Sequence, residues 1–137
     1  MITGMGTWDV GHFDNDTAAD FSGKLDAAAE AERESIIRTA LTSTIESDEF
    51  LDSYEACQAV ASAALIAAQL PGGTPVTTAY GPDNPLPVFP ADLRALAVQA
   101  LDRVLAPESE LVELWDETEY GPQWRQSVAD LKAVLLT

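Results

Sequence analysis

The chain has 137 residues, enough for one domain that buries a core without disulfides or metal ions. Its 23 Asp and Glu residues outnumber its 7 Lys and Arg residues, which gives a formal net charge of -16 at pH 7. Proteins bind nucleic acids largely by neutralising phosphates with Lys and Arg, so this charge argues against direct binding to DNA or RNA.

The first residues contain the most chemically mixed stretch of the chain. Residues 1–4 carry no pattern, and we expect them to be a flexible extension. The following stretch combines the only His with aromatic and acidic residues. We treat it as a candidate ligand or interaction segment, consisting of Trp8, His12, Phe13, Asp14, Asn15, Asp16 and Asp20.

The acidic residues of this segment allow two interpretations. Asp14, Asn15 or Asp16 can cap a helix, because a side-chain oxygen there accepts hydrogen bonds from the free amides of the first turn. The same oxygens could bind a divalent cation, but Ala19 and Leu25 stand where a calcium loop needs Gly and Glu. We favour helix capping and assign no metal site.

The same segment resembles the opening signature of a bacterial family, domain-of-unknown-function family 4259. The resemblance rests on a Trp, a Phe and an Asn-Asp pair at fixed spacing, in Met5-Gly6-Thr7-Trp8, Gly11 and Phe13-Asp14-Asn15-Asp16-Thr17-Ala18-Ala19-Asp20-Phe21. It implies a small cytoplasmic bacterial protein without an assigned activity. It therefore names a family and supplies no mechanism.

Apolar residues at helical spacing predict about five to six helices along the chain. The first ends near Leu25, and the second spans about residues 28–46. Asp52 and Glu55 form a capping box that opens a third helix, which extends to Leu70. This helix is apolar almost all round, so we expect it to lie in the middle of the domain with neighbours on most sides.

A proline-rich stretch separates the third helix from the fourth. Residues 71–90 contain six prolines, which exclude a regular helix, so we expect a long loop whose end is held to the core by Val88 and Phe89. The fourth helix begins near Pro90 and has the clearest periodicity of the chain, with Leu93, Leu96, Ala97, Ala100, Leu101 and Val104 on one face.

Two further helices complete the predicted fold. Ser109 is expected to cap a short fifth helix, and the turn Tyr120-Gly121-Pro122 leads into a last one. Strand and hairpin patterns are missing from the sequence. We therefore predict an all-α bundle forming a single domain over residues 1–137.

The sequence contains no motif that supports catalysis. One Cys and one His cannot build a zinc site, and neither a nucleophile elbow nor a phosphate-binding loop occurs. We interpret Cys57 as a buried core residue and His12 as a loop residue. The sequence therefore predicts no cofactor and favours a non-enzymatic protein, while it leaves enzymatic activity open.

Composition also favours a location in the cytoplasm. The most apolar window, residues 59–68, is too short to cross a bilayer, so we expect no membrane association. We expect no signal peptide, because no Lys or Arg precedes Lys24 and no apolar run follows the start. A single Cys cannot form an internal disulfide, which suits a reducing compartment.

A second candidate site is a run of carboxylates with interleaved aromatic residues. It consists of Glu108, Glu110, Glu113, Trp115, Asp116, Glu117, Glu119 and Tyr120, without a basic residue among them. Another acidic cluster lies within residues 46–55. Such runs are often only solvated surface, but acidic groups with aromatic anchors also suit the binding of a basic protein.

Binding of a basic protein is therefore our leading hypothesis, with the chain acting as an inhibitor or immunity-like factor. The alternative is a site for a small molecule or a divalent metal, with or without enzymatic activity, on residues 8–20. The sequence leaves the oligomeric state open.

Overall fold

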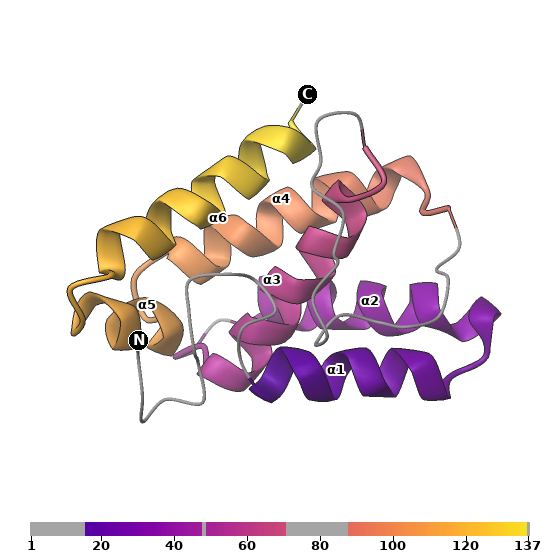
Figure 1. Ribbon diagram of the computed structural model, residues 1–137, viewed down its shortest axis with the longest axis horizontal. Coiled ribbons are helices and arrows are strands. Elements are labelled where there is room, and N and C mark those ends of the chain that lie inside the picture. The colour runs from indigo at the N-terminus through magenta and orange to yellow at the C-terminus, as the bar shows by residue number, and fades with distance from the viewer. Residues whose placement is uncertain (1–15, 48, 71–87, 137) are drawn as a thin grey trace.

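The computed structural model describes residues 16–47, 49–70 and 88–136, and the fold there is an all-α bundle, as predicted. Figure 1 shows α1 and α2 on one side of α3, with α4 and α6 on the other. The six helices are α1 (Asp16–Ala27), α2 (Glu30–Ile45), α3 (Ser53–Ala67), α4 (Ala91–Leu105), α5 (Glu110–Asp116) and α6 (Gly121–Leu135).

Helix α3 is the centre of the bundle and contacts each of the other five helices described. From Ala56 to Ala67, every residue of α3 except Gln58 is buried. Alanine dominates this stretch, and its small side chain lets neighbouring helices approach closely. The prediction that this helix lies in the middle is confirmed, although the helix ends at Ala67 and not at Leu70.

The outer helices bury one face each. In α4 the predicted stripe is buried, apart from Leu96, which is half-buried against the core. Helix α2 buries Ile37, Ala40, Leu41 and Thr44, which recur at helical spacing, and Ile45 packs half-buried against the core. Periodicity therefore predicted the inward faces correctly.

The ends of the helices differ in how they are capped. Asp52 caps α3 as predicted, since its Oδ1 accepts a hydrogen bond from the amide of Glu55 at 2.8 Å, but within the described residues the Glu55 carboxylate does not complete the predicted capping box. Ser109 stands at the N-cap of α5, but its side chain does not cap the helix, so that prediction is wrong. Its hydroxyl is buried and has no hydrogen-bond partner among the described residues.

The turn before α6 is closely packed, which explains its glycine. A Cβ at Gly121 would lie 2.9 Å from the carbonyl oxygen of Trp115, closer than real Cβ contacts allow. Glycine therefore lets α5 and α6 approach each other directly after the turn. The predicted turn and the predicted last helix are both confirmed.

Some predictions concern residues outside the described ranges. These are the extension at 1–4 and the proline-rich loop up to residue 87. At the described end of that loop, Phe89 packs against the core and its amide donates to Oε1 of Gln69 at 3.1 Å. Val88 is 90% exposed, so the prediction that it is held to the core is wrong.

Candidate functional site

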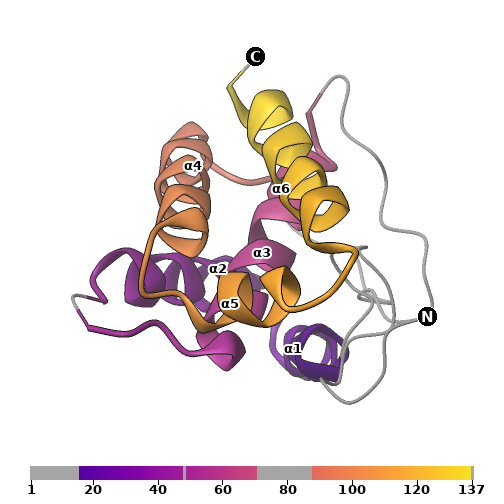
Figure 2. The same ribbon diagram turned by 90° about the vertical axis from the view of Figure 1, so that its left-hand side faces the viewer.

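The described parts of the two acidic runs, residues 46–47 with 49–55 and residues 108–119, lie side by side at one end of the molecule, which faces the viewer in Figure 2. The amide of Leu51 donates to the carbonyl of Glu108, and the amide of Glu110 donates to the carbonyl of Leu51, both at 2.8 Å. These bonds form an isolated parallel bridge between Leu51 and Ser109. The bridge joins segments that are far apart in the sequence.

Arg103 of α4 ties the same two segments together. Its Nε donates to the carbonyl of Ser47 at 3.1 Å, and its Nη2 donates to the carbonyl of Glu49 at 2.6 Å. The guanidinium also reaches the carbonyls of Pro107 and Glu108, each at 3.4 Å. The planar guanidinium of this half-buried arginine, with its five donors, thereby fixes both loops to each other.

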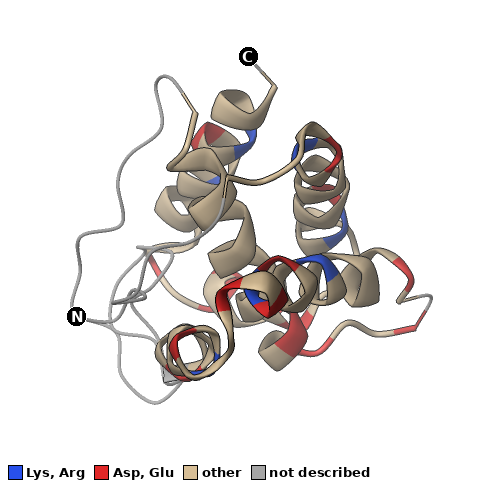
Figure 3. Cartoon of the chain, turned by 90° about the vertical axis from the view of Figure 1, so that its right-hand side faces the viewer, with Lys and Arg blue, Asp and Glu red and all other residues tan. Residues whose placement is uncertain are grey.

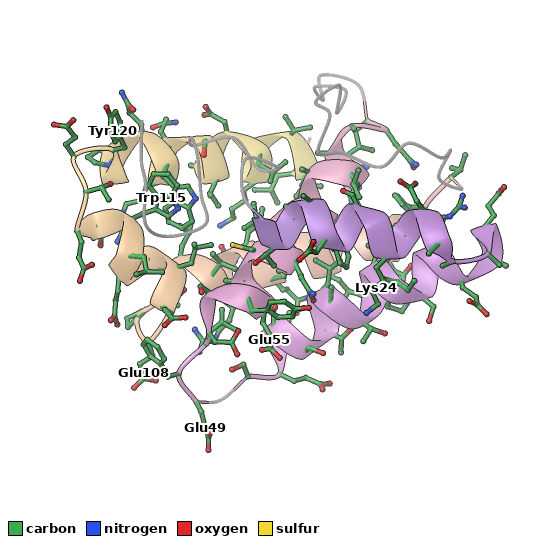
Figure 4. The ribbon with its side chains drawn as sticks, turned by 60° about the horizontal axis from the view of Figure 1, so that its bottom comes forward. Lys24, Glu49, Glu55, Glu108, Trp115 and Tyr120 are labelled. Atoms are coloured by element: carbon green, nitrogen blue, oxygen red, sulfur yellow. The ribbon has the colours of Figure 1, made fainter. Side chains whose placement is uncertain are left out.

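We call this region the acidic end and define it by eight carboxylates: Glu46, Glu49, Asp52, Glu55, Glu108, Glu113, Glu117 and Glu119. Seven of them are exposed, and Glu55 is half-buried. Figure 4 shows Glu49, Glu55 and Glu108 in this region. Within the part of the chain that the structure describes, none of the eight forms an ion pair, so their negative potential is left for solvent or a cationic partner.

Two carboxylates of the predicted surface have structural partners instead. Glu110 is half-buried, and its Oε1 accepts a hydrogen bond from the amide of Ser53 at 2.7 Å, at the start of α3. Asp116 pairs with Arg125 at 2.6 Å, and this hydrogen bond holds the pKa of Asp116 below its ordinary value. We therefore leave both residues out of the acidic end.

The aromatic residues of the predicted surface face inward. Trp115 is 2% exposed and stacks on Trp124 of α6, with ring centroids 6.0 Å apart and planes 7° from parallel. Tyr120 is half-buried and packs against the core. These residues join α5 to α6, so their side chains are not placed to anchor a partner.

Two other aromatic residues are exposed at the acidic end, and the sequence analysis missed them. Phe50 is 51% exposed between Glu49 and Leu51, and Tyr54 is 58% exposed in the first turn of α3. Their polar neighbours in the sequence were the available signal. Exposed aromatic side chains are enriched at protein-binding surfaces.

Figure 3 shows Lys and Arg positions on several helices, and most of these side chains are engaged within the bundle. Three arginines bind backbone carbonyls: Arg33 at the end of α1, Arg94 at the end of α6, and Arg103 at the loops. Three more cations pair with carboxylates: Arg38 with Asp92, Arg125 with Asp116, and Lys132 with Asp102. For Lys24, the residues that the structure describes provide neither an ion pair nor a hydrogen bond.

The candidate segment near the N-terminus is described only in part. Trp8, His12, Phe13, Asp14 and Asn15 lie outside the described residues, and the structure does not describe the side chain of Asp16. Asp16 begins α1, and Asp20 is exposed on that helix. In the described ranges, no three His, Cys, Asp or Glu side chains gather as a metal site requires.

Cys57 lies in the core, as predicted. It is 6% exposed on α3, and burial raises the pKa of its thiol to about 12. A thiol of this pKa remains protonated at neutral pH and is a poor nucleophile.

Of the helices described, none is long and apolar enough to cross a membrane.

Comparison with known proteins identifies the family. A search of curated proteins and a search of solved structures each found no match. The family model described as "Domain of unknown function (DUF4259)" matches residues 6–127, which is most of the chain. The family suspected from the sequence is thereby confirmed, and the chain belongs to the DUF4259 family.

Proposed function

We propose that this protein binds a basic protein partner through the acidic end and acts as a non-enzymatic inhibitor or immunity-like factor. The observation that carries the proposal is the bridge between Leu51 and Ser109, which joins two acidic runs into one surface. Two separate clusters would each attract a cation weakly, whereas one continuous surface can accelerate the encounter with a basic protein and orient it.

The arrangement of the cations supports the same proposal. Arg103, the basic residue that ties the acidic end together, directs its guanidinium to backbone carbonyls. It therefore holds the loops in place without forming ion pairs with the eight carboxylates in the described structure. Phe50 and Tyr54 add exposed aromatic area, which supplies affinity that charge alone does not.

We also infer that the protein works in the bacterial cytoplasm. This inference rests on the lone, buried Cys57, which suits a reducing compartment.

The proposal is tested by purifying the tagged protein from its host at low and at moderate salt. We expect a stoichiometric basic protein that elutes at moderate salt, because screening weakens contacts between exposed charges. The double variant Glu49→Gln/Glu113→Gln should retain less of this basic protein than the parent protein does. The control is Glu30→Gln/Glu32→Gln, which removes the same charge at the start of α2, far from the acidic end. Equal retention by both variants would remove the reason for the proposal.

A further inference from the structure

A groove of about 340 Å³ lies between α1, α2 and the first turns of α3. This volume is at the lower end of the range of about 300–1,000 Å³ that ligand pockets occupy, so it suits one long side chain better than a whole helix. Phe21, Ile36 and Ala40 contribute apolar surface to the groove. Hydroxyl groups on one face of α2 also line it, from Ser35 and Thr39 among others.

One part of the groove belongs to the acidic end. Asp52, Tyr54 and Glu55 line it from α3, and Asp52 and Glu55 are two of the eight carboxylates that define that region. Oδ1 of Asp52 caps α3, and the half-buried carboxylate of Glu55 makes no hydrogen bond or ion pair with the residues described. The groove is therefore continuous with the acidic end.

We propose that this groove receives an arginine side chain of the basic partner, an inference that rests on the proposed function. The methylene groups of arginine would lie chiefly on Ile36, which is half-buried, because Phe21 exposes little of its surface. Its planar guanidinium would stack on the ring of Tyr54 and donate hydrogen bonds to the carboxylate of Glu55. Lysine fits less well, because its ammonium group is compact and more strongly hydrated.

Lys24 gives the groove a direction. It lines the groove from α1, and Figure 4 shows it away from Glu55 on the same side of the molecule. An ammonium group there repels a bound guanidinium and directs it toward the carboxylates of α3. The occupant therefore enters with its charged head toward Glu55, and removal of the Lys24 charge should strengthen binding.

The test uses N-acetyl-arginine methylamide as the probe, because its only charge is the guanidinium. Titration into the isotopically labelled protein, followed by NMR, should give saturable binding with a Kd on the order of 1 mM, typical of a single anchoring group. The shifted signals should come from Phe21, Ile36, Tyr54 and Glu55. The corresponding lysine and norleucine derivatives should bind more weakly.

Variants of the groove separate this site from general charge attraction. Glu55→Gln keeps the backbone amide that Asp52 caps. It should weaken binding of the probe about fivefold, as expected for loss of a charge-assisted hydrogen bond. Tyr54→Ala should weaken it about two- to fivefold. Lys24→Gln should bind the probe more tightly, and Glu119→Gln, which removes a carboxylate outside the groove, should bind it nearly as the parent protein does.

Non-saturable binding, or equal losses in Glu55→Gln and Glu119→Gln, would overturn the proposed groove site. Tighter binding of the lysine probe, or weaker binding by Lys24→Gln, would overturn the assignment of arginine and its direction. The two proposals fail separately. If a basic partner binds Tyr54→Ala and Glu55→Gln as tightly as it binds the parent protein, the groove proposal fails and the proposed function stands. If the probe binds saturably but no basic partner is found, the proposed function fails and the groove site stands.

Discussion

Helix α3 and the acidic end share the first turn of the helix, but they are built by different means. In α3, alanines are buried on nearly all sides, and the position of the helix is fixed by contacts with five neighbours. At the acidic end, backbone hydrogen bonds and the guanidinium of Arg103 hold exposed loops together. Helix α3 determines the fold through packing. The acidic end presents charge to solvent, and only a few residues hold its loops in place.

This difference separates residues that stabilise the bundle from residues that are free to bind. Buried groups in α3 cannot change without loss of packing. Exposed carboxylates contribute little to stability and can be replaced with small effect on the fold. Substitutions in each of the two regions therefore test this distinction.

The largest effect is expected at Trp115, which belongs to the acidic run in the sequence and to the core in the structure. Trp115→Ala removes the stack on Trp124 and should lower the free energy of unfolding by about 3–5 kcal/mol, measured by urea denaturation. Tyr54→Ala removes an exposed aromatic side chain and serves as the control. A similar small loss in both variants would contradict the placement of Trp115 in the core.

A smaller loss is expected at Arg103, which holds the acidic end together. Arg103→Gln removes hydrogen bonds to carbonyls of both loops and should lower the free energy of unfolding by about 2 kcal/mol. Hydrogen exchange at the amides of Leu51 and Glu110 should accelerate as well, because the bridge opens more often. Lys132→Gln breaks the exposed ion pair with Asp102 and should lower the free energy of unfolding by less than Arg103→Gln does. Equal decreases in the two variants would show that Arg103 contributes no more than an ordinary surface residue.

The backbone of Glu108 gives a prediction of opposite sign. Its φ is 65°, a conformation that Gly adopts readily and most residues with a side chain disfavour. Glu108→Gly should raise the free energy of unfolding by up to about 1 kcal/mol. Glu113→Gly, placed within α5, should lower it by about 1 kcal/mol. Thermal or urea denaturation of both variants checks the sign, and destabilisation by Glu108→Gly would contradict the strain.

The smallest effect concerns pH and the exposed ion pairs. Hydrogen bonds from Arg38 and Arg125 hold the pKa values of Asp92 and Asp116 below the ordinary value of 3.8. Their contribution to stability is therefore complete above pH 3.8 and is lost as the pH falls through the lower folded values. Asp92→Asn/Asp116→Asn should flatten the decline in unfolding free energy below pH 3.8. A decline as steep as that of the parent protein would show that the pairs do not stabilise the fold.

The helices and their buried faces could be predicted from the sequence because they depend on local spacing. The stripe of α4, the cap at Asp52 and the central place of α3 each follow from residues within one segment. Family membership likewise followed from a short signature near the N-terminus.

The acidic end could be predicted only in part, because its geometry depends on contacts between distant segments. Composition identified both acidic runs, but no local pattern indicated that Leu51 pairs with Ser109. Spacing within a seven-residue helix also could not show that Trp115 stacks on Trp124 of α6. Exposure of Phe50 and Tyr54 likewise depends on where neighbouring helices end.

The most direct test of the central claim is the association rate with the salt-released basic partner, measured at several ionic strengths. If the acidic end steers the encounter, Glu49→Gln/Glu113→Gln should associate about tenfold more slowly than the parent protein at low salt, and the difference should shrink as salt is added. Glu30→Gln/Glu32→Gln, which removes the same charge elsewhere, should change the rate much less. Equal slowing by both variants would show that only net charge acts, and it would contradict the assignment of binding to the acidic end.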